Sequence, residues 1–226
     1  MRLWITGSLQ EVKDAVKLGL AGAVVTNPTV ISQWSSGTRA LEDVVAEACD
    51  ATGLPLYVQL YGPDKRSFIR ELRHLKEISK LIVPKLPATM EGLAATRDLA
   101  SEGETVLVTA VCSIQQAFLA AVAGAEFICP YFARLNDAGQ EAATLIQDSR
   151  NLYEGNGFAT EIIPASIRSI QDLSASLFAG AHGAILPVKV FYDAFENELT
   201  KSSLATFEQD WQTIPYGRGI IDGRDA

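Results

Sequence analysis

The chain has 226 residues, of which 48% are hydrophobic and 20% are charged, which is enough for one large globular domain or two small ones. Its formal net charge of −8 argues against nucleic acid as a partner, and no apolar run approaches the about 20 residues of a membrane helix. The N-terminal residues MRLWITGS lack the succession of a signal peptide, and the 3 cysteines have no metal-like spacing, so we expect no membrane partner, no metal, no cofactor and a reducing cytoplasm.

Short apolar segments alternate with amphipathic segments along the chain. Strands are predicted at 2–6, 21–26, 56–60, 81–89, 104–109, 126–130, 160–164 and 182–187. Helices are predicted at 8–19, 38–51, 63–80, 89–101, 113–123, 138–156, 169–179, 188–196 and 199–212, with Ser8 and Thr89 as capping residues of the first and the fourth. The tail 216–226 is rich in glycine and charge and is predicted to be loose.

Eight strands that are each followed by a helix predict a (β/α)₈ TIM barrel, with residues 1–226 as a single domain. A doubly wound open sheet is the alternative, but it usually stops at about five or six strands and carries a glycine-rich phosphate loop that this sequence lacks. The additional C-terminal helix, within 199–213, has an apolar stripe of Leu199, Leu204, Phe207 and Trp211. That stripe is predicted either to cover one end of the barrel or to pack on a neighbouring molecule.

One lysine stands out in the fourth predicted strand, LIVPKLPAT. Lys85 follows a run of apolar residues, and burial disfavours the ammonium form and lowers the pKa of a lysine. Such an amine attacks carbonyl carbon and forms a Schiff base. The alternative is a lysine that extends to the surface or pairs with a carboxylate.

The carboxyl ends of the predicted strands are polar, and the active site of a TIM barrel lies at those ends. The residues there are Thr6, Thr26, Asn27, Gln59, Lys85, Thr109, Tyr131, Ser166 and Arg168. This set contains one amine among hydroxyls and amides, with no set of metal ligands and no Ser-His-Asp arrangement. It fits Schiff-base chemistry in which hydroxyls and a water molecule relay protons. Each of these side chains could instead serve the core, a turn or the surface.

Six segments occur in an order and spacing that carry a family resemblance. They are VTNPTVI at 25–31, VPKLP at 83–87, VTAV at 108–111, AGAEFICPYFARL at 123–135, PASIR at 164–168 and FEQDW at 207–211. As a set they resemble the transaldolase family, in particular its small subfamily that includes fructose-6-phosphate aldolase. The resemblance covers nearly the whole chain and implies pentameric rings that pair into decamers, with the C-terminal helix at an interface.

The resemblance implies a role for each matching residue. Lys85 matches the Schiff-base lysine, and Gln59, Thr109 and Tyr131 match the trio that holds the catalytic water in the aldolases. Transaldolases proper tend to have Glu and Phe at the first and last positions of that trio. The substrate-binding positions are Thr6, Thr26 and Asn27 on the dihydroxyacetone side and Arg134, Ser166 and Arg168 on the phosphate side. Either arginine could instead pair with a carboxylate such as Asp137 or Asp172.

Two positions depart from the family pattern. The family usually has Asp at the end of the first strand, where this chain has Thr6, and Thr where it has Val25. Thr6 can donate and accept a hydrogen bond but does not ionise near neutral pH. Lost acid–base assistance typically lowers a rate by about 10²–10⁴-fold.

The sequence therefore predicts a class I aldolase that converts fructose 6-phosphate, or a close relative, to dihydroxyacetone and glyceraldehyde 3-phosphate. One alternative is a transaldolase, which would need an acceptor before it released product. Another is a sugar-phosphate-binding protein with impaired catalysis, motivated by Thr6 and Val25.

Overall fold

The structure is a computed structural model that describes residues 1–214, so the predicted loose tail at 216–226 lies outside the described residues. By its internal contacts the chain separates into two compact units, Met1–Phe191 and the segment from Tyr192 onward. A single domain over 1–226 stays a prediction.

The first unit is a parallel barrel. Its strands are β1 (Arg2–Thr6), β2 (Ala23–Val25), β3 (Leu56–Gln59), β4 (Ile82–Pro87), β5 (Leu107–Val111), β6 (Phe127–Pro130), β7 (Glu161–Ile162) and β8 (Gly183–Pro187). They pair in parallel in the order β7-β6-β5-β4-β3-β2-β1-β8. Backbone hydrogen bonds from His182 to Ile162 and from Ile185 to Pro164, each 2.9 Å, join the two outermost strands. The predicted (β/α)₈ barrel is confirmed.

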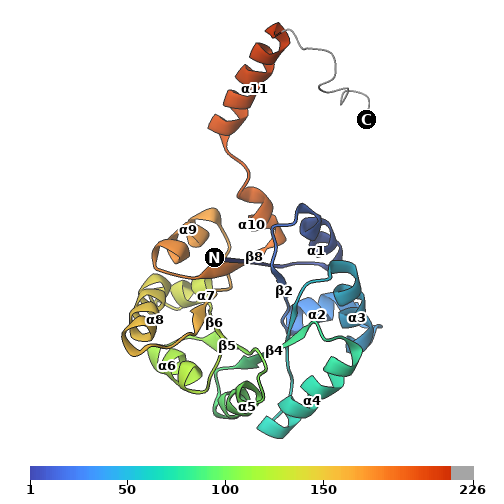
Figure 1. The fold of residues 1–226 in the computed structure, drawn as a ribbon, viewed down its shortest axis with the longest axis vertical. Coiled ribbons are helices and arrows are strands. Elements are labelled where there is room, and N and C mark those ends of the chain that lie inside the picture. Colours follow the sequence, from blue (N-terminus) through green and yellow to red (C-terminus); the bar gives the residue numbers. More distant parts are fainter. Residues whose placement is uncertain (215–226) are drawn as a thin grey trace. The chain divides into compact units, whose positions relative to one another are not determined.

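Helices surround the strands, and their colours follow the chain around the ring in Figure 1. They are α1 (Leu9–Ala15) with the 3₁₀ turn η1 (Val16–Leu18), α3 (Leu41–Thr52), α4 (Lys65–Ile78), α5 (Met90–Ser101), α6 (Ile114–Val122), α8 (Ala142–Asn156), α9 (Ile170–Phe178) and α10 (Val188–Asp193). Hydroxyl side chains cap four of them, the first two as predicted, because each accepts a hydrogen bond from a backbone N–H of the first turn. Those caps are Ser8, Thr89, Ser113 and Ser169.

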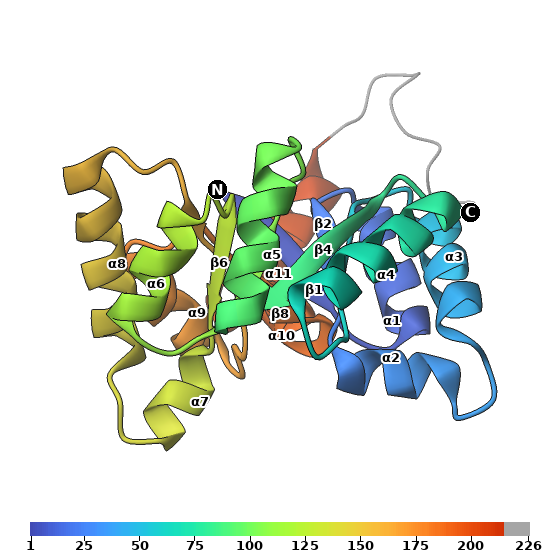
Figure 2. The same ribbon diagram turned by 90° about the horizontal axis from the view of Figure 1, so that it is seen from below.

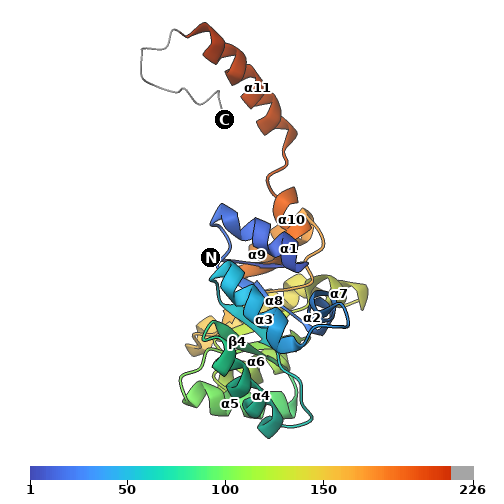
Figure 3. The same cartoon turned by 90° about the vertical axis from the view of Figure 1, so that its right-hand side faces the viewer.

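Two further helices were not predicted from the sequence. Helix α2 (Pro28–Ser35) begins at a proline that suggested a turn, but Pro28 occupies the first helical position, where its missing N–H costs nothing. Helix α7 (Phe132–Asp137) is short and starts directly from the end of β6, and the predicted helix at 138–156 begins only at Ala142. Both helices lie at the same end of the barrel in Figures 2 and 3. That end carries the carboxyl ends of the strands.

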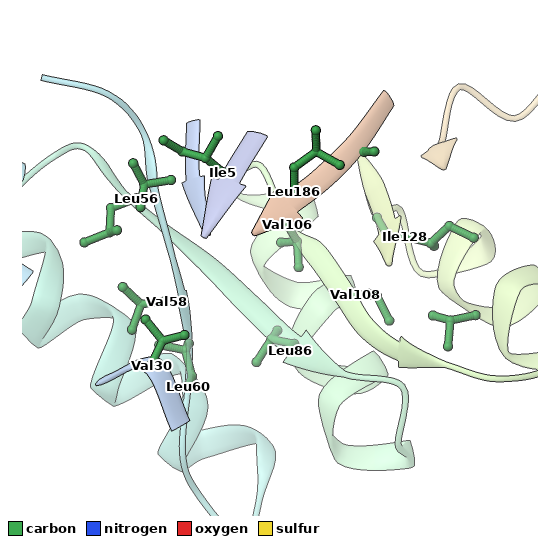
Figure 4. Close-up of a cluster of buried hydrophobic side chains, with 14 of the residues drawn as sticks. Ile5, Val30, Leu56, Val58, Leu60, Leu86, Val106, Val108, Ile128 and Leu186 are labelled. Carbon is green, nitrogen blue, oxygen red and sulfur yellow. The ribbon is translucent and has the colours of Figure 1, made fainter. Parts of the chain in front are cut away.

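Side chains of the strands alternate between the helices and the barrel interior. The outward residues form the larger core, and Figure 4 shows Ile5, Val58, Leu86, Val108 and Ile128 among them. The inward cluster includes Trp4, which stacks on Tyr57 at 4.5 Å between ring centroids and meets the edge of Phe127 at 4.9 Å. These rings fill the middle of the barrel, as side chains do in this fold, and leave space for a site only at an end.

Pro84 lies inside β4, although proline cannot donate to a sheet ladder. Alternate residues of a parallel strand bond to opposite neighbours. Lys85 bonds to β3, because its carbonyl accepts from the Leu60 N–H at 3.1 Å, so Pro84 faces β5. Pairing with β5 starts at Lys85, one residue later. The missing donor therefore falls just before that ladder begins.

Gly92 in the first turn of α5 gives a stability prediction. A Cβ at this position would lie 2.0 Å from the Pro87 carbonyl oxygen. We expect Gly92→Ala to lower the free energy of unfolding by about 1–3 kcal/mol, because α5 or β4 must shift. Gly155 in α8 is the matched control, since its Cβ would meet nothing within 4 Å, and Gly155→Ala should stabilise by about 0.5–1 kcal/mol. Urea unfolding measures both, and equal effects would contradict the close approach.

The second unit contains α11 (Glu198–Thr213), which is capped by Asn197. The residues Leu204, Phe207, Trp211 and Ile214 follow helical spacing, and each is about half exposed. Within residues 1–214, no helix is long and apolar enough to cross a membrane.

Candidate active site

A cavity of about 250 Å³ opens at the carboxyl ends of the strands. Its polar lining is Thr6, Thr26, Asn27, Lys85, Tyr131, Arg134 and Ser166. Its other lining residues are Gly7, Val25, Val30, Ala165, Ile185 and Pro187. Seven of the predicted site residues thus meet in one small space, which suits a molecule of a few carbon atoms.

Lys85 points inward from β4 and is 3% exposed. Its Nζ donates a hydrogen bond to the carbonyl oxygen of Thr26 at 2.9 Å. Burial lowers the pKa of Lys85 below its ordinary value; nearby Cys129 acts in the opposite direction, and the charge of Arg134 acts in the same direction. None of the described lining residues is a carboxylate that could hold the ammonium form. The site therefore favours the neutral, nucleophilic amine.

Asn27 is placed by the helix that the sequence did not predict. Its side-chain oxygen accepts the N–H of Val30 at 2.9 Å and so caps α2. This bond fixes the orientation of the amide, because its oxygen is engaged. The amide nitrogen is then the group of Asn27 that can donate to an oxygen in the cavity.

Tyr131 and Thr109 form a hydroxyl pair beside the cavity. Thr109 Oγ1 donates to the Tyr131 hydroxyl at 3.2 Å. Burial raises the pKa of Tyr131, so its hydroxyl stays protonated at neutral pH. Thr109 precedes a bulge in β5, where Ala110 has a φ of 58°. That irregularity changes the direction of the strand at the level of the site.

Gln59 and Thr109 do not line the cavity, but they flank the strand that carries the lysine. Gln59 on β3 is the register partner of Lys85, and Thr109 on β5 is the register partner of Pro87. Partners in a sheet point to the same face, so both side chains point into the barrel with Lys85. A water bound among these groups would lie next to the cavity.

The predicted phosphate residues lie on two segments held together by their backbones. Arg134 on α7 lines the cavity, with its guanidinium 4.8 Å from the centre of the Tyr131 ring. Ser166 also lines the cavity. Its φ of 59° is a left-handed conformation, which is energetically unfavourable for any residue other than glycine. Arg168 does not line the cavity: its guanidinium pairs with Asp137 at 2.7 Å, the kind of pairing that the sequence left open.

The apolar wall of the cavity was not predicted from the sequence. Ile185 and Pro187 occupy alternate positions at the end of β8, so the two-residue period of a strand could have placed them inside. Val30 could not be found that way, because it belongs to the unpredicted α2. No described residues form a group of three or more His, Cys, Asp or Glu that could hold a metal ion.

Fold and site together define a (β/α)₈-barrel protein with a buried amine in a small polar cavity at the carboxyl ends of its strands. The model of the Transaldolase/Fructose-6-phosphate aldolase family matches residues 4–215, and the chain belongs to this family. The resemblance predicted from the sequence is confirmed.

Similar proteins include three that are named probable transaldolases. The one from Rhodospirillum centenum is 38% identical, with 96% of this chain and 92% of the relative covered. Those from Pelotomaculum thermopropionicum and Aquifex aeolicus are 36% and 37% identical, covering 95% and 93% of this chain and 99% and 95% of the relatives. The family relationship supports an activity of the aldolase or transaldolase type.

Proposed function

We propose that the protein is a class I aldolase that cleaves or forms a carbon–carbon bond of a ketose phosphate such as fructose 6-phosphate. The observation that carries this proposal is Lys85, buried without a carboxylate partner among the described lining residues of the cavity. A neutral amine so placed is the nucleophile that Schiff-base chemistry requires.

In the proposed reaction the amine of Lys85 attacks the keto carbon, and the carbonyl oxygen leaves as water. The resulting iminium accepts the electron pair of the bond between carbons 3 and 4 as the hydroxyl on carbon 4 loses its proton. Glyceraldehyde 3-phosphate leaves, and the enamine is protonated at carbon 3. Water then hydrolyses the iminium and releases dihydroxyacetone and the free amine.

The surrounding residues supply positions for these steps. Thr6, Thr26 and Asn27 would hold the hydroxyls of the three-carbon unit from β1, β2 and the start of α2. A water held by Gln59, Thr109 and Tyr131 would carry the protons, a role supported by the hydroxyl pair of Thr109 and Tyr131. Arg134 and Ser166 would receive the phosphate, and Arg168 would join them when its side chain leaves Asp137, since a guanidinium donates two hydrogen bonds to a phosphate at once.

Transaldolase activity is the second candidate, and the names of the relatives favour it. Gln59 and Tyr131 favour the aldolase, because transaldolases of the resembling family tend to have Glu and Phe there. The two differ in what leaves the enzyme without an acceptor. Release of free dihydroxyacetone from fructose 6-phosphate alone would identify the aldolase.

Borohydride trapping tests the proposal. The protein is incubated with dihydroxyacetone, reduced, digested, and searched for modified lysines by mass spectrometry. We expect a three-carbon adduct on Lys85. If the protein bound fructose 6-phosphate but formed no adduct on any lysine, the proposal would be contradicted. The alternative of a sugar-phosphate-binding protein with impaired catalysis, motivated by Thr6 and Val25, would then be favoured.

We also propose that the protein acts in the cytoplasm as a homo-oligomer, a pentamer or decamer. The apolar stripe of α11, exposed within the described part of the chain, supports packing on another copy. A molecular mass in solution equal to that of one chain would contradict the proposed oligomer.

A further inference from the structure

Two segments meet at the rim of the cavity on its phosphate side. The N–H of Phe132 donates to the Ala165 carbonyl at 2.9 Å, and the N–H of Ala133 donates to the Ser166 carbonyl at 3.1 Å. The first turn of α7 is therefore fixed against the loop that follows β7. Charged side chains of the two segments lie within reach of each other as a result.

Arg168 is already occupied at this rim. Its guanidinium Nη1 lies 2.7 Å from Asp137 Oδ2, and the two side chains are 56% and 58% exposed. Asp137 lies three residues after Arg134 on α7, a spacing that places both on one side of the helix. Arg134 lines the cavity and Asp137 does not, but side chains at this spacing are neighbours, so we expect the carboxylate of Asp137 beside the place where an anionic group would bind.

We propose that Asp137 is a specificity-determining residue: it holds Arg168 when no phosphate is bound, and it thereby weakens the preference for phosphorylated over unphosphorylated substrates. This inference rests on the proposed function and names a residue that opposes phosphate binding rather than one that supports it.

The pair is suited to exchange because it is exposed. Exposed ion pairs contribute little to stability, since water and salt screen them. A phosphate dianion offers more charge and more acceptor oxygens than a carboxylate, so it can take over a guanidinium. The backbone of Arg168 is held in place during this exchange, because its N–H donates a hydrogen bond to Asp172 Oδ2 at 2.8 Å. Only the side chain has to turn.

Asp137 opposes phosphate in two ways. It competes for the guanidinium, and its negative charge repels the incoming phosphate. Unphosphorylated substrates meet neither effect. Removing the carboxylate should therefore favour phosphorylated substrates selectively, and the effect should depend on Arg168.

Binding of inorganic phosphate, measured by calorimetry on the full chain, tests this. We expect Asp137→Asn to lower the dissociation constant about three- to tenfold. The matched control is Glu102→Gln, which removes the same charge from another exposed ion pair, with Arg73, at the end of α5 that precedes β5 and so lies at the opposite end of the barrel. That control should leave the constant unchanged. In an Arg168→Gln background, Asp137→Asn should change the constant by less than about twofold.

The proposal is overturned if Asp137→Asn matches Glu102→Gln, or if its full effect persists without Arg168. The ratio of kcat/KM for glyceraldehyde 3-phosphate over glyceraldehyde should rise in Asp137→Asn by the same factor as phosphate affinity. Failure of the proposed function looks different, because trapping with dihydroxyacetone involves no phosphate. A missing adduct on Lys85 together with tighter phosphate binding in Asp137→Asn would overturn the aldolase and keep the role of Asp137.

Discussion

Lys85→Met is expected to lower kcat/KM for fructose 6-phosphate by about 10⁴-fold or more, the scale seen when a covalent nucleophile is removed. Methionine has a side chain of similar length and suits a buried position, so the cavity should keep its shape. The loss should appear in kcat as well as in kcat/KM, and no borohydride adduct should form. Steady-state kinetics and mass spectrometry of the reduced protein measure both effects.

Lys189→Met is the matched control. Lys189 also follows a strand, at the start of α10, but it does not line the cavity. This variant should keep the adduct on Lys85 and most of the activity. An adduct found on Lys189 of the original protein would refute the assignment of Lys85 as the nucleophile. An ordinary kcat in Lys85→Met would refute it as well.

Lys85→Met also tests the lowered pKa of Lys85, through the pH dependence of the free energy of unfolding. The folded-state pKa of Lys85 is lowered because burial penalises the charged form of the amine, and this penalty lowers the free energy of unfolding. Below that folded-state pKa the amine is charged in both states and the penalty is complete; it fades as pH rises toward the unfolded value of about 10.4. Lys85→Met should therefore stabilise the protein most at low pH and progressively less toward that value, as urea unfolding at several pH values would show. The rate of trapping in the original protein should rise with pH, with a midpoint below the ordinary lysine pKa.

Tyr131→Phe has the second largest expected effect. We expect kcat to fall by about 10²–10⁴-fold, because the variant keeps the ring but removes the hydroxyl that Thr109 contacts at 3.2 Å. Schiff-base formation depends on the amine of Lys85 and should persist. The expected pattern is slow turnover with an adduct still trapped on Lys85, measured by kinetics and reduction side by side.

Tyr153→Phe provides the control for this loss. Tyr153 is also buried, but its hydroxyl donates to the Ala117 carbonyl at 2.8 Å, and it does not line the cavity. Removing that hydrogen bond should lower the free energy of unfolding by about 1 kcal/mol and leave kcat unchanged. If the two variants lost kcat equally, the role of Tyr131 would be structural.

Much of the barrel could be predicted from the sequence because its signals are local. The strand around Lys85 is a short apolar run, and the caps at Ser8 and Thr89 are read from a few neighbouring residues. Helix α2 could not be predicted that way, since Pro28 is equally compatible with a turn and with the first helical position.

The polar residues that line the cavity were predictable for the same reason, but the contacts between their side chains were not. Strand ends place Thr6, Lys85 and Tyr131 in one cavity by topology alone. The ion pair between Arg168 and Asp137 depends on how two segments from different parts of the chain pack together, and no local sequence pattern predicts that packing.

The packed barrel interior has a consequence for the order of events. The rings of Trp4, Tyr57 and Phe127 lie beneath the cavity, and Arg2 covers Phe127 from the other side while paired with Glu161 at 2.7 Å. Within the described residues 1–214, substrate and product would therefore use the same entrance. In the proposed reaction, a second aldehyde would reach the enamine on Lys85 only after the first had left, so the two aldehydes should compete for the same binding position and bind one after the other.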